Sequence, residues 1–344
     1  MRIVHWVAHN GSGMFHVAET LWRSERKLGL DTHLVDIDKV PPEAWDKYGD
    51  ADIHVPHTNF PNEMRKRLKK PLKMVFLSHG TPEHIFNLSM QQGKQGYGHG
   101  DPLMLWMHWM KTADAVVTFW PRHQAIMQSL CDKNTRVRLI PLGIDKEFWS
   151  AGVSRGKYVG NPSVMSCENG HLIKWPLDLF TMWPWVYEQV PDACLHVNYL
   201  PLDQHRWWFP LVNRNGASFG AHISPLRYQQ SELRNVLASV DYYCGLVKYG
   251  DFNRMGLEAA TAGAKLISYR GNPYADFWLS EGDQRIQAQE LVAILKGDTG
   301  PRKDKSPIAD DMDTANAMVE IYKELLVTDA VAVPQKVSRK AKKR

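Results

Sequence analysis

The sequence predicts an α/β protein of two similar domains, each with a parallel sheet, that face each other across a cleft. Short apolar runs alternate with segments of helical periodicity, which favours parallel strands joined by crossover helices. The alternation begins again after a polar segment at residues 150–157. The chain has 344 residues, 44% of them hydrophobic, which is enough for two cores. Ligands bind beyond the carboxyl ends of parallel strands, so we expect the functional site between the two sheets.

The first half contains six strand candidates and several helices. Residues 14–28 have helical spacing, with Val17, Leu21 and Leu28 on one face. Residues 122–130 predict another helix, and 106–112 predict the end of a third. Residues 80–105 read as a long glycine-rich insertion, and loops of this length usually carry function. The strand candidates, each an apolar run flanked by turn residues, are 3–8, 32–36, 52–55, 74–78, 115–119 and 136–140.

The second half repeats this organisation. Its strand candidates are 164–167, 193–197, 218–219, 242–246 and 265–269, and its helices are 177–189, 230–238, 255–262 and 289–295. A final amphipathic helix is expected at 311–327. We therefore expect a first domain at residues 1–150, a second at 151–310 and a disordered basic tail at 334–344.

Positive charge is concentrated in two segments. The six basic side chains after Pro334 outnumber the net charge of +5, so the rest of the chain is close to neutral. A second basic run covers residues 65–73. Such runs are usually solvated and disordered. The alternative is an electrostatic attachment to nucleic acid or to an anionic membrane surface.

The cysteines and the apolar runs bear on the compartment. Cys131, Cys167, Cys194 and Cys244 lie far apart in the sequence, which argues against a zinc ribbon or a disulfide scaffold and suits a reducing compartment. The N-terminus enters a strand pattern at once and lacks the apolar run of a signal peptide. No stretch reaches the roughly 18 apolar residues of a membrane span. We expect a cytoplasmic protein without a transmembrane segment.

Gly11, Ser12 and Gly13 form a predicted turn between the first strand and the first helix. Glycines allow the backbone amides to approach a ligand, and the start of a helix favours an anion such as a diphosphate. His16 stands where a dinucleotide-binding motif has its third glycine, so the turn is a poor NAD motif. The simpler interpretation is an ordinary tight turn.

His79 follows a predicted strand, which places it at the carboxyl end of the first sheet. Its imidazole could bond a substrate hydroxyl or carbonyl near neutral pH, or make a structural hydrogen bond only. His54 with His57, and His79 with Glu83 and His84, are the closest groupings for a metal. Neither has a further ligand at a spacing that fixes a site, so no metal is expected.

Two pairs of aspartates are further candidates for binding a metal ion. Asp36 with Asp38, and Asp50 with Asp52, have the spacing of aspartates that hold a divalent ion. Such pairs are frequent by chance, and we interpret them as solvated loop acids.

The segment at residues 250–263 contains the most information. A loop of Gly, Asp and Asn follows a predicted strand and leads into a helix that starts near Met255. Loop amides and a helix start favour phosphate oxygens. Glu258 lies one turn inside the helix, where a carboxylate can accept bonds from two hydroxyls, as in a ribose. The competing interpretation is an amphipathic helix whose acid interacts with the helix dipole.

Five stretches, in order, carry a resemblance to a known family. They are ADAVVT at 113–118, the segment 136–140, PLGID at 141–145 with Phe148, the segment 232–241, and EAATAGAKLI at 258–267. Together they resemble the retaining GT-B glycosyltransferases of the glycogen-synthase and lipid-mannosyltransferase kind, over nearly the whole chain. The resemblance implies two Rossmann-like domains, an acceptor domain followed by a donor-binding domain, with the last helix packed back on the first.

The resemblance also implies roles for individual residues. His79 would lie near the transferred sugar, Lys174 would neutralise the leaving diphosphate, and Glu258 would hold the ribose. The implied catalytic residues are His79 and Lys174, and the implied donor-binding residues are Gly11, Ser12, Gly13, Ile223, Asp251, Asn253, Arg254, Met255 and Glu258.

The sequence departs from the family pattern at two positions. Gly250, with Asp251 beside it, stands where the family has the first of two glutamates, which leaves the identity of the sugar open. Near Asn169 the family has an arginine, and the charge is missing here; Arg254 or Lys248 could replace it.

The function that the resemblance implies is transfer of a hexosyl or pentosyl group from a nucleoside diphosphate sugar to an acceptor hydroxyl, with retention. No metal or further cofactor is expected. The basic segments suit a polyanionic acceptor such as modified DNA, and a lipid or polysaccharide is the alternative. A non-catalytic nucleotide-sugar-binding protein of the same fold is the competing hypothesis, because of Gly250. An epimerase is a third.

Overall fold

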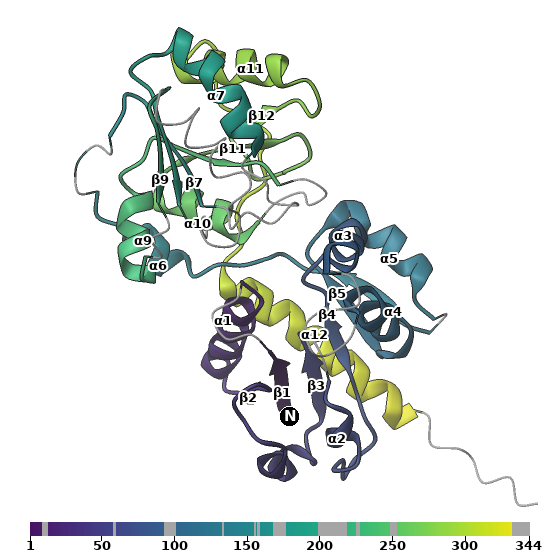
Figure 1. Ribbon diagram of the computed structural model, residues 1–344. Coiled ribbons are helices and arrows are strands. Elements are labelled where there is room, and N and C mark those ends of the chain that lie inside the picture. The colour runs from purple at the N-terminus through teal and green to yellow at the C-terminus, as the bar shows by residue number, and fades with distance from the viewer. Residues whose placement is uncertain are drawn as a thin grey trace, which may run out of the picture.

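The computed structural model has two lobes joined by two connecting segments (Figure 1). It describes residues 1–8, 13–57, 60–92, 101–132, 134–154, 156, 159–167, 177–198, 219–224, 228–247 and 253–331.

The first lobe contains six parallel strands in two groups of three. One group has the order β2-β1-β3 and the other β4-β5-β6. A parallel bridge from His54 to Met74 links the groups, so the strands run across the lobe as 2-1-3-4-5-6. The strands are β1 (Arg2–Val7), β2 (Asp31–Asp36), β3 (Ile53–Pro56), β4 (Val75–Leu77), β5 (Ala115–Thr118) and β6 (Arg136–Leu139).

Helices cover this sheet because its strands are apolar on both faces. Trp6 and Trp109 are buried in one core with Phe60 and Met110, on one side of the sheet. The helical elements of the lobe are α1 (Gly13–Lys27), the 3-10 helix η1 (Pro42–Tyr48), α2 (Asn62–Arg65), α3 (Pro82–Gln92), α4 (Pro102–Thr112), the 3-10 helix η3 (Pro121–His123) and α5 (Gln124–Leu130).

The second lobe has one sheet of six parallel strands in the order β12-β11-β10-β7-β8-β9. The strands are β7 (Ser163–Cys167), β8 (Cys194–Asn198), β9 (Ala221–Ser224), β10 (Tyr242–Gly245), β11 (Lys265–Tyr269) and β12 (Phe277–Leu279). Helices α6 (Lys146–Ser150), α7 (Leu177–Gln189), α9 (Gln230–Leu237), α10 (Arg254–Ala262) and α11 (Gln284–Lys296) belong to this lobe.

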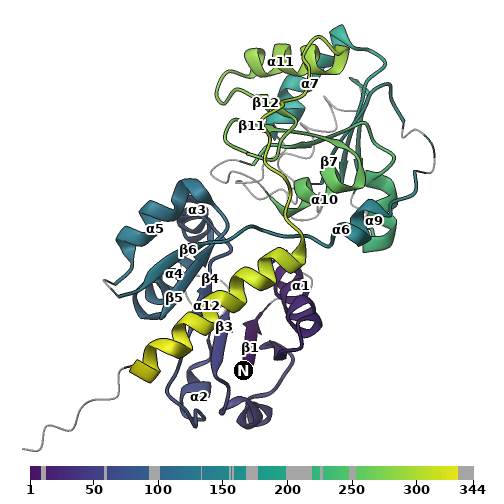
Figure 2. The ribbon, with the colours of Figure 1, turned by 180° about the vertical axis from the view of Figure 1, so that it is seen from behind.

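The two connecting segments run side by side between the lobes. Ile144, on the way into the second lobe, forms a parallel bridge with Asp310, on the way back. The last helix, α12 (Asp311–Val331), then crosses the first lobe and packs against α1 (Figure 2). The Gly143 N–H donates to the Thr314 hydroxyl at 2.7 Å, and that hydroxyl donates to the Pro141 carbonyl at 2.9 Å. These bonds fix the start of α12 to the first connecting segment, which we call the hinge.

The structure corrects several expected elements. The glycine-rich insertion expected at 80–105 contains all of α3 and the start of α4. The strand expected at 218–219 lies at Ala221–Ser224 instead, after a turn at Gly220 with φ +64°. Leu28, expected on the buried face of the first helix, is 36% exposed, whereas Glu25 on that face is fully buried. None of the described helices is long and apolar enough to cross a membrane. The basic tail at 334–344 lies outside the described residues.

Candidate functional site

The start of α10 lies at the carboxyl end of β10, a central strand of the second sheet. Asn253 caps the helix, since its side chain accepts a hydrogen bond from the Gly256 N–H at 2.8 Å. This cap satisfies one of the amides that a helix start leaves without partners. The other amides and the helix dipole make the position favourable for an anion.

Arg254, the first residue of α10, connects the two lobes. Its Nε donates to Glu258 Oε1 at 2.7 Å, and its Nη2 donates to the hydroxyl of Thr20, on α1, at 3.0 Å. The side chain is only 15% exposed. Its Nη1 is buried and has no hydrogen-bond partner within the described part of the chain. An unsatisfied guanidinium N–H is costly, so this donor is well suited to an anionic ligand.

Two titratable side chains near Arg254, Glu258 and His16, affect the charge around it. Burial raises the pKa of Glu258, and the guanidinium of Arg254 acts in the opposite direction, lowering it. Burial and the same guanidinium lower the pKa of His16, on α1, so this histidine adds no positive charge at neutral pH. Arg254 therefore shares this part of the structure with the Glu258 carboxylate and with the acidic side chain of Asp311, which lines the same cavity.

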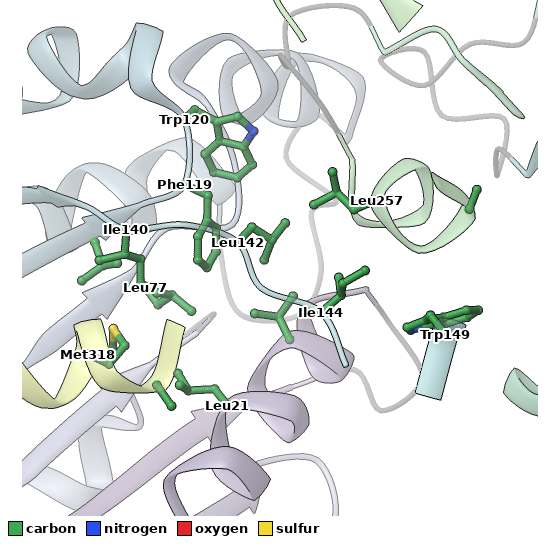
Figure 3. Close-up of a cluster of buried hydrophobic side chains, with 14 of the residues drawn as sticks. Leu21, Leu77, Phe119, Trp120, Ile140, Leu142, Ile144, Trp149, Leu257 and Met318 are labelled. Atoms are coloured by element: carbon green, nitrogen blue, oxygen red, sulfur yellow. The ribbon is translucent and has the colours of Figure 1, made fainter. Parts of the chain in front are cut away.

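Both lobes and the connecting segments meet at this point. A small cavity is lined by α1, by the first connecting segment, by Arg254 and by the start of α12; its residues are Val17, Thr20, Leu21, Leu142, Gly143, Arg254, Asp311 and Thr314. Figure 3 shows the apolar side of the junction, where Leu142 and Ile144 lie between Leu257 of α10 and Leu21 of α1. The interlobe contact is thus partly apolar and partly made by Arg254.

His79 lies beyond the carboxyl end of β4, an inner strand of the first sheet, directly after the buried Ser78. Its Nε2 is 2.8 Å from Nδ1 of His57, which directly follows β3. Burial lowers the pKa of His79 to about 3, so the ring is neutral at physiological pH. Since Nε2 of this neutral ring is in hydrogen-bond contact with His57, Nδ1 is the nitrogen that can bond a ligand.

The structure brings some of the predicted site residues together. Asn253, Arg254 and Glu258 share the start of α10, and the helix that begins at Gly13 reaches Arg254 through Thr20. Met255 is partly buried against the apolar junction. Ile223 lies on β9, the edge strand, whereas α10 follows β10, three positions away in the sheet. Lys174, Gly11, Ser12, Asp251 and the loop position Gly250 lie outside the described residues.

Several polar residues near the site were not predicted from the sequence. Thr20 is one of them, and nothing in its local sequence indicates a contact with a residue 234 positions away. A buried group of His5, Glu25 and His57 is the other. For Glu25 the sequence did contain an indication. It lies one turn after Leu21 on the apolar face of a helix, and an acid in such a position indicates a buried polar contact.

The histidine groupings considered for a metal are engaged in other contacts. His54 Nδ1 accepts a hydrogen bond from the Trp6 indole at 3.1 Å, and His57 bonds His5 and His79. Glu83 lies 3.1 Å from His123. Among the residues that the structure describes, no three His, Cys, Asp or Glu side chains are placed to share a metal ion.

No protein-family model and no curated protein matches this sequence. Solved structures match its fold over nearly the whole chain. Sucrose-phosphate synthase from Thermosynechococcus elongatus has a TM-score of 0.70 at 13% identity, covering 95% of this chain and 100% of that one. Trehalose-6-phosphate synthase OtsA has a TM-score of 0.62 at 12% identity, covering 97% and 100%. HepE from Anabaena, in complex with UDP-glucose, has a TM-score of 0.61 at 14% identity, covering 96% and 100%.

These likenesses establish the fold. The chain has the GT-B architecture, with two Rossmann-like domains and parallel sheets, and the predicted fold class is confirmed. At identities of 12–14%, the likeness carries no activity with it.

Proposed function

We propose that this protein is a glycosyltransferase that takes a sugar from a nucleoside diphosphate sugar, held at the start of α10, and transfers it to an acceptor hydroxyl. The observation that carries the proposal is Arg254. It is a largely buried guanidinium at a helix start, between two lobes, and its Nη1 has no hydrogen-bond partner among the described residues. A diphosphate supplies the oxygens that this donor and the helix amides require. HepE, which has the same fold, was solved with UDP-glucose.

The proposed roles follow from this placement. Arg254 and the amides of α10 stabilise the negative charge that develops on the leaving diphosphate, which is usually the largest contribution to such catalysis. Glu258 holds Arg254 through its Oε1 and has a second oxygen for a ribose hydroxyl. The positive charge of Lys174 neutralises part of the negative charge of the diphosphate. His79 faces the sugar from the first sheet. The first lobe binds the acceptor and the second binds the donor.

Binding of the donor tests the proposal without an acceptor. Arg254→Gln is expected to weaken binding of a nucleoside diphosphate by at least about tenfold, roughly 1.4 kcal/mol, measured by calorimetry. Arg234→Gln is the matched control, because Arg234 is a second part-buried arginine of the same lobe, whose guanidinium donates to the Phe148 carbonyl and stacks on the Phe148 ring instead of bonding Glu258 and Thr20. Equal affinities for the two variants would reject Arg254 as the diphosphate ligand.

Turnover tests the remaining roles. Lys174→Ala and Glu258→Ala are each expected to lower donor turnover by at least about tenfold, roughly 1.4 kcal/mol of transition-state stabilisation. Nucleoside diphosphate release is measured across UDP-, GDP-, ADP- and dTDP-sugars. A protein that binds these donors and releases no nucleoside diphosphate, with or without an acceptor, would be a binding module instead. Product sugar formed without an acceptor would indicate an epimerase.

Retention of the anomeric configuration completes the proposed reaction. The proposed route is front-face, in which the acceptor oxygen attacks from the side that the diphosphate leaves. The sugar is a hexose or a pentose. Proton NMR of the first product formed reads the anomeric coupling directly, and an inverted product would exclude this route.

Two surface features suggest the class of acceptor. In the basic run at 65–73, Arg67 and Lys70 form ion pairs with Asp46 and Asp52, so part of the run is neutralised. Lys66 and Lys69 in the same run are exposed. This charge and the tail at 334–344 favour a polyanion such as DNA. Loss of a steep salt dependence of DNA binding on deleting residues 335–344 would support it, and no DNA binding at low salt would exclude it.

Exposed apolar side chains on α3 favour the other class of acceptor, a lipid. Phe86 and Met90 lie one turn apart on this helix and are 52% and 69% exposed. Exposed apolar pairs of this kind favour a lipid-linked acceptor. Flotation with neutral and anionic vesicles separates the two classes, with Phe86→Ser expected to abolish lipid binding and to leave DNA binding unchanged.

A further inference from the structure

A continuous row of polar side chains crosses the buried interior of the first lobe behind His79. His79 Nε2 lies 2.8 Å from His57 Nδ1, and His57 Nε2 lies 3.0 Å from His5 Nδ1. His5 Nε2 lies 2.8 Å from Glu25 Oε2. His5 and Glu25 are fully buried, and His57 is 2% exposed. Four titratable groups in hydrogen-bond contact inside an apolar core are uncommon, because burial of unpaired polar groups is costly.

The hydrogen positions in this row follow from its far end. Glu25 is an acceptor at both oxygens: Thr32 donates to Oε2 and Tyr322 to Oε1, at 2.8 and 2.9 Å. Burial and Glu25 raise the pKa of Tyr322 well above its ordinary range, so that hydroxyl stays protonated. His5 therefore donates from Nε2 and accepts at Nδ1.

The same logic continues along the row. With His5 accepting at Nδ1, His57 donates from Nε2 and accepts at Nδ1. His79 then donates from Nε2, which leaves Nδ1 as its acceptor nitrogen. All three rings thus carry their proton on Nε2, and the row has a single direction.

The surroundings of the row leave one place for an additional proton. Burial lowers the pKa of His57 well below its ordinary range, with His79 and His5 adding to the effect, and burial alone lowers that of His79 to about 3. His5, in contrast, contacts the carboxylate of Glu25. The groups that face Glu25 are the hydroxyls of Thr32 and Tyr322, and the neighbouring Ser24 hydroxyl bonds Asp311, at the start of α12. None of these is a cation.

We propose that His57, His5 and Glu25 are positioning residues that form a proton relay for His79, and that the relay stores the acceptor's proton as a His5 imidazolium beside the Glu25 carboxylate. This deepens the proposed function and rests on it for the identity of the proton donor. The acceptor O–H bond breaks, and its electron pair forms the bond to the anomeric carbon. The bond from the anomeric carbon to the diphosphate oxygen breaks, and the diphosphate leaves with the electron pair of that bond.

The proton moves in three steps. It goes to His79 Nδ1, while the proton on His79 Nε2 moves to His57 Nδ1, and the proton on His57 Nε2 moves to His5 Nδ1. His5 is then protonated at both nitrogens, and His57 and His79 carry their protons on Nδ1. The return of the proton to water through His79 restores the starting arrangement.

Histidine NMR tests the relay without any substrate. In protein labelled with ¹⁵N-histidine, long-range ¹H–¹⁵N spectra identify which nitrogen of each ring is protonated, and His→Gln variants assign the signals. At pH 9 we expect His5, His57 and His79 all protonated on Nε2. A proton that enters the row is expected to move the protons of His57 and His79 to Nδ1 in the same step, so the signals of the three rings should change together. A His79 protonated on Nδ1 at pH 9, or one that titrates independently of His5, would overturn the relay.

Turnover gives the second test. Glu25→Gln is expected to lower turnover of the fastest of the UDP-, GDP-, ADP- and dTDP-sugar donors about a hundredfold, the lower end of the range for general base catalysis, with an unchanged donor Kd and a shifted pH profile. His54→Gln is the matched control, because His54 is a buried histidine on β3 whose ring bonds Trp6 outside the row. A Glu25→Gln enzyme with wild-type rate and pH profile would refute the relay. Absence of turnover in the wild-type protein would reject the proposed function, and the NMR result would decide the relay alone.

Discussion

Replacing Arg254 with methionine should destabilise the protein by an amount that depends on pH. Arg254 is 15% exposed and Glu258 8% exposed, and their side chains are joined at 2.7 Å. Methionine keeps most of the side-chain volume and removes the charge, so it leaves a buried carboxylate without its counter-charge. Breaking a buried ion pair in this way costs about 3–5 kcal/mol.

The sign of the pH dependence follows from the pKa of Glu258. Burial raises this pKa above the ordinary value of 4.5. The contribution of Glu258 to stability is therefore fully present below the unfolded pKa and is lost as the pH rises through the folded pKa. Arg254 is the group that lowers the folded pKa, so its removal raises this pKa further and increases the loss. The variant should be about 3 kcal/mol less stable than the wild type above neutral pH, and this difference should shrink as the pH falls toward 4.5.

Urea unfolding at pH 8 and pH 5 measures the difference directly. The double variant Arg254→Met/Glu258→Gln adds an internal control, because it removes both charges. It should be less destabilised than the sum of the single variants, by about 1–3 kcal/mol. The reasoning would be refuted by a loss of stability that is equal at both pH values together with additive single variants.

Three further predictions concern the packing of each lobe and the hinge. Tyr322→Phe should cost about 1.5–3 kcal/mol, because it removes a hydrogen bond to the buried Glu25 carboxylate; a change in the urea midpoint too small to measure would show that this contact contributes nothing. Gly143→Ala should cost about 1–3 kcal/mol, since the added Cβ would lie 2.1 Å from the Asp310 carbonyl oxygen at the start of α12; an unchanged melting temperature would contradict that packing. Trp183→Ala on α7, where the side chain is 1% exposed, should cost about 3–5 kcal/mol, while Trp185→Ala on the same helix, 38% exposed, should cost less than about 1 kcal/mol. Equal losses for the two tryptophans would contradict the orientation of α7.

The parallel sheets could be predicted because buried strands read as short apolar runs. The residues of β1, β5 and β11 are almost entirely buried, and each is a short apolar run between turn residues, the pattern that indicates a buried strand. β9 shows where this signal fails. His222 and Ser224 alternate with apolar residues at the edge of the sheet, so the strand contains no apolar run. The expected strand was therefore placed too early, on the far side of Gly220.

Composition hid α3 in the same way. The glycines at 93–100 suggested that the whole of 80–105 was one insertion. The local signals for a helix were present, because Pro82 is its first residue and the Thr81 hydroxyl accepts a hydrogen bond from the His84 N–H at 3.2 Å. The helix is therefore indicated by the residues at its start and not by the composition of residues 80–105.

The site was predictable only in its local parts. The sequence placed Asn253, Arg254 and Glu258 at the start of one helix, because a polar loop precedes an apolar helical pattern there. The sequence suggested a role for the Arg254 side chain only as a replacement for the family's arginine, which is missing near Asn169. The contact of Arg254 with Thr20 depends on how the two lobes meet, which no local pattern records. The row from His79 to Glu25 similarly joins β4, β3, β1 and α1, which lie far apart in the chain.

Thermal stabilisation by nucleoside diphosphates tests the central claim most directly. The melting temperature is measured with UDP, GDP, ADP, CDP and dTDP, each alone at millimolar concentration, for the wild type and for Arg254→Met. A ligand present at 100 times its Kd stabilises by about 2.7 kcal/mol. We predict a clear increase with at least one base in the wild type and a markedly smaller increase in the variant, about half as large for a tenfold loss of affinity, measured as the shift from each protein's own melting temperature. No shift with any nucleoside diphosphate, or equal shifts in both proteins, would contradict a donor site at the start of α10.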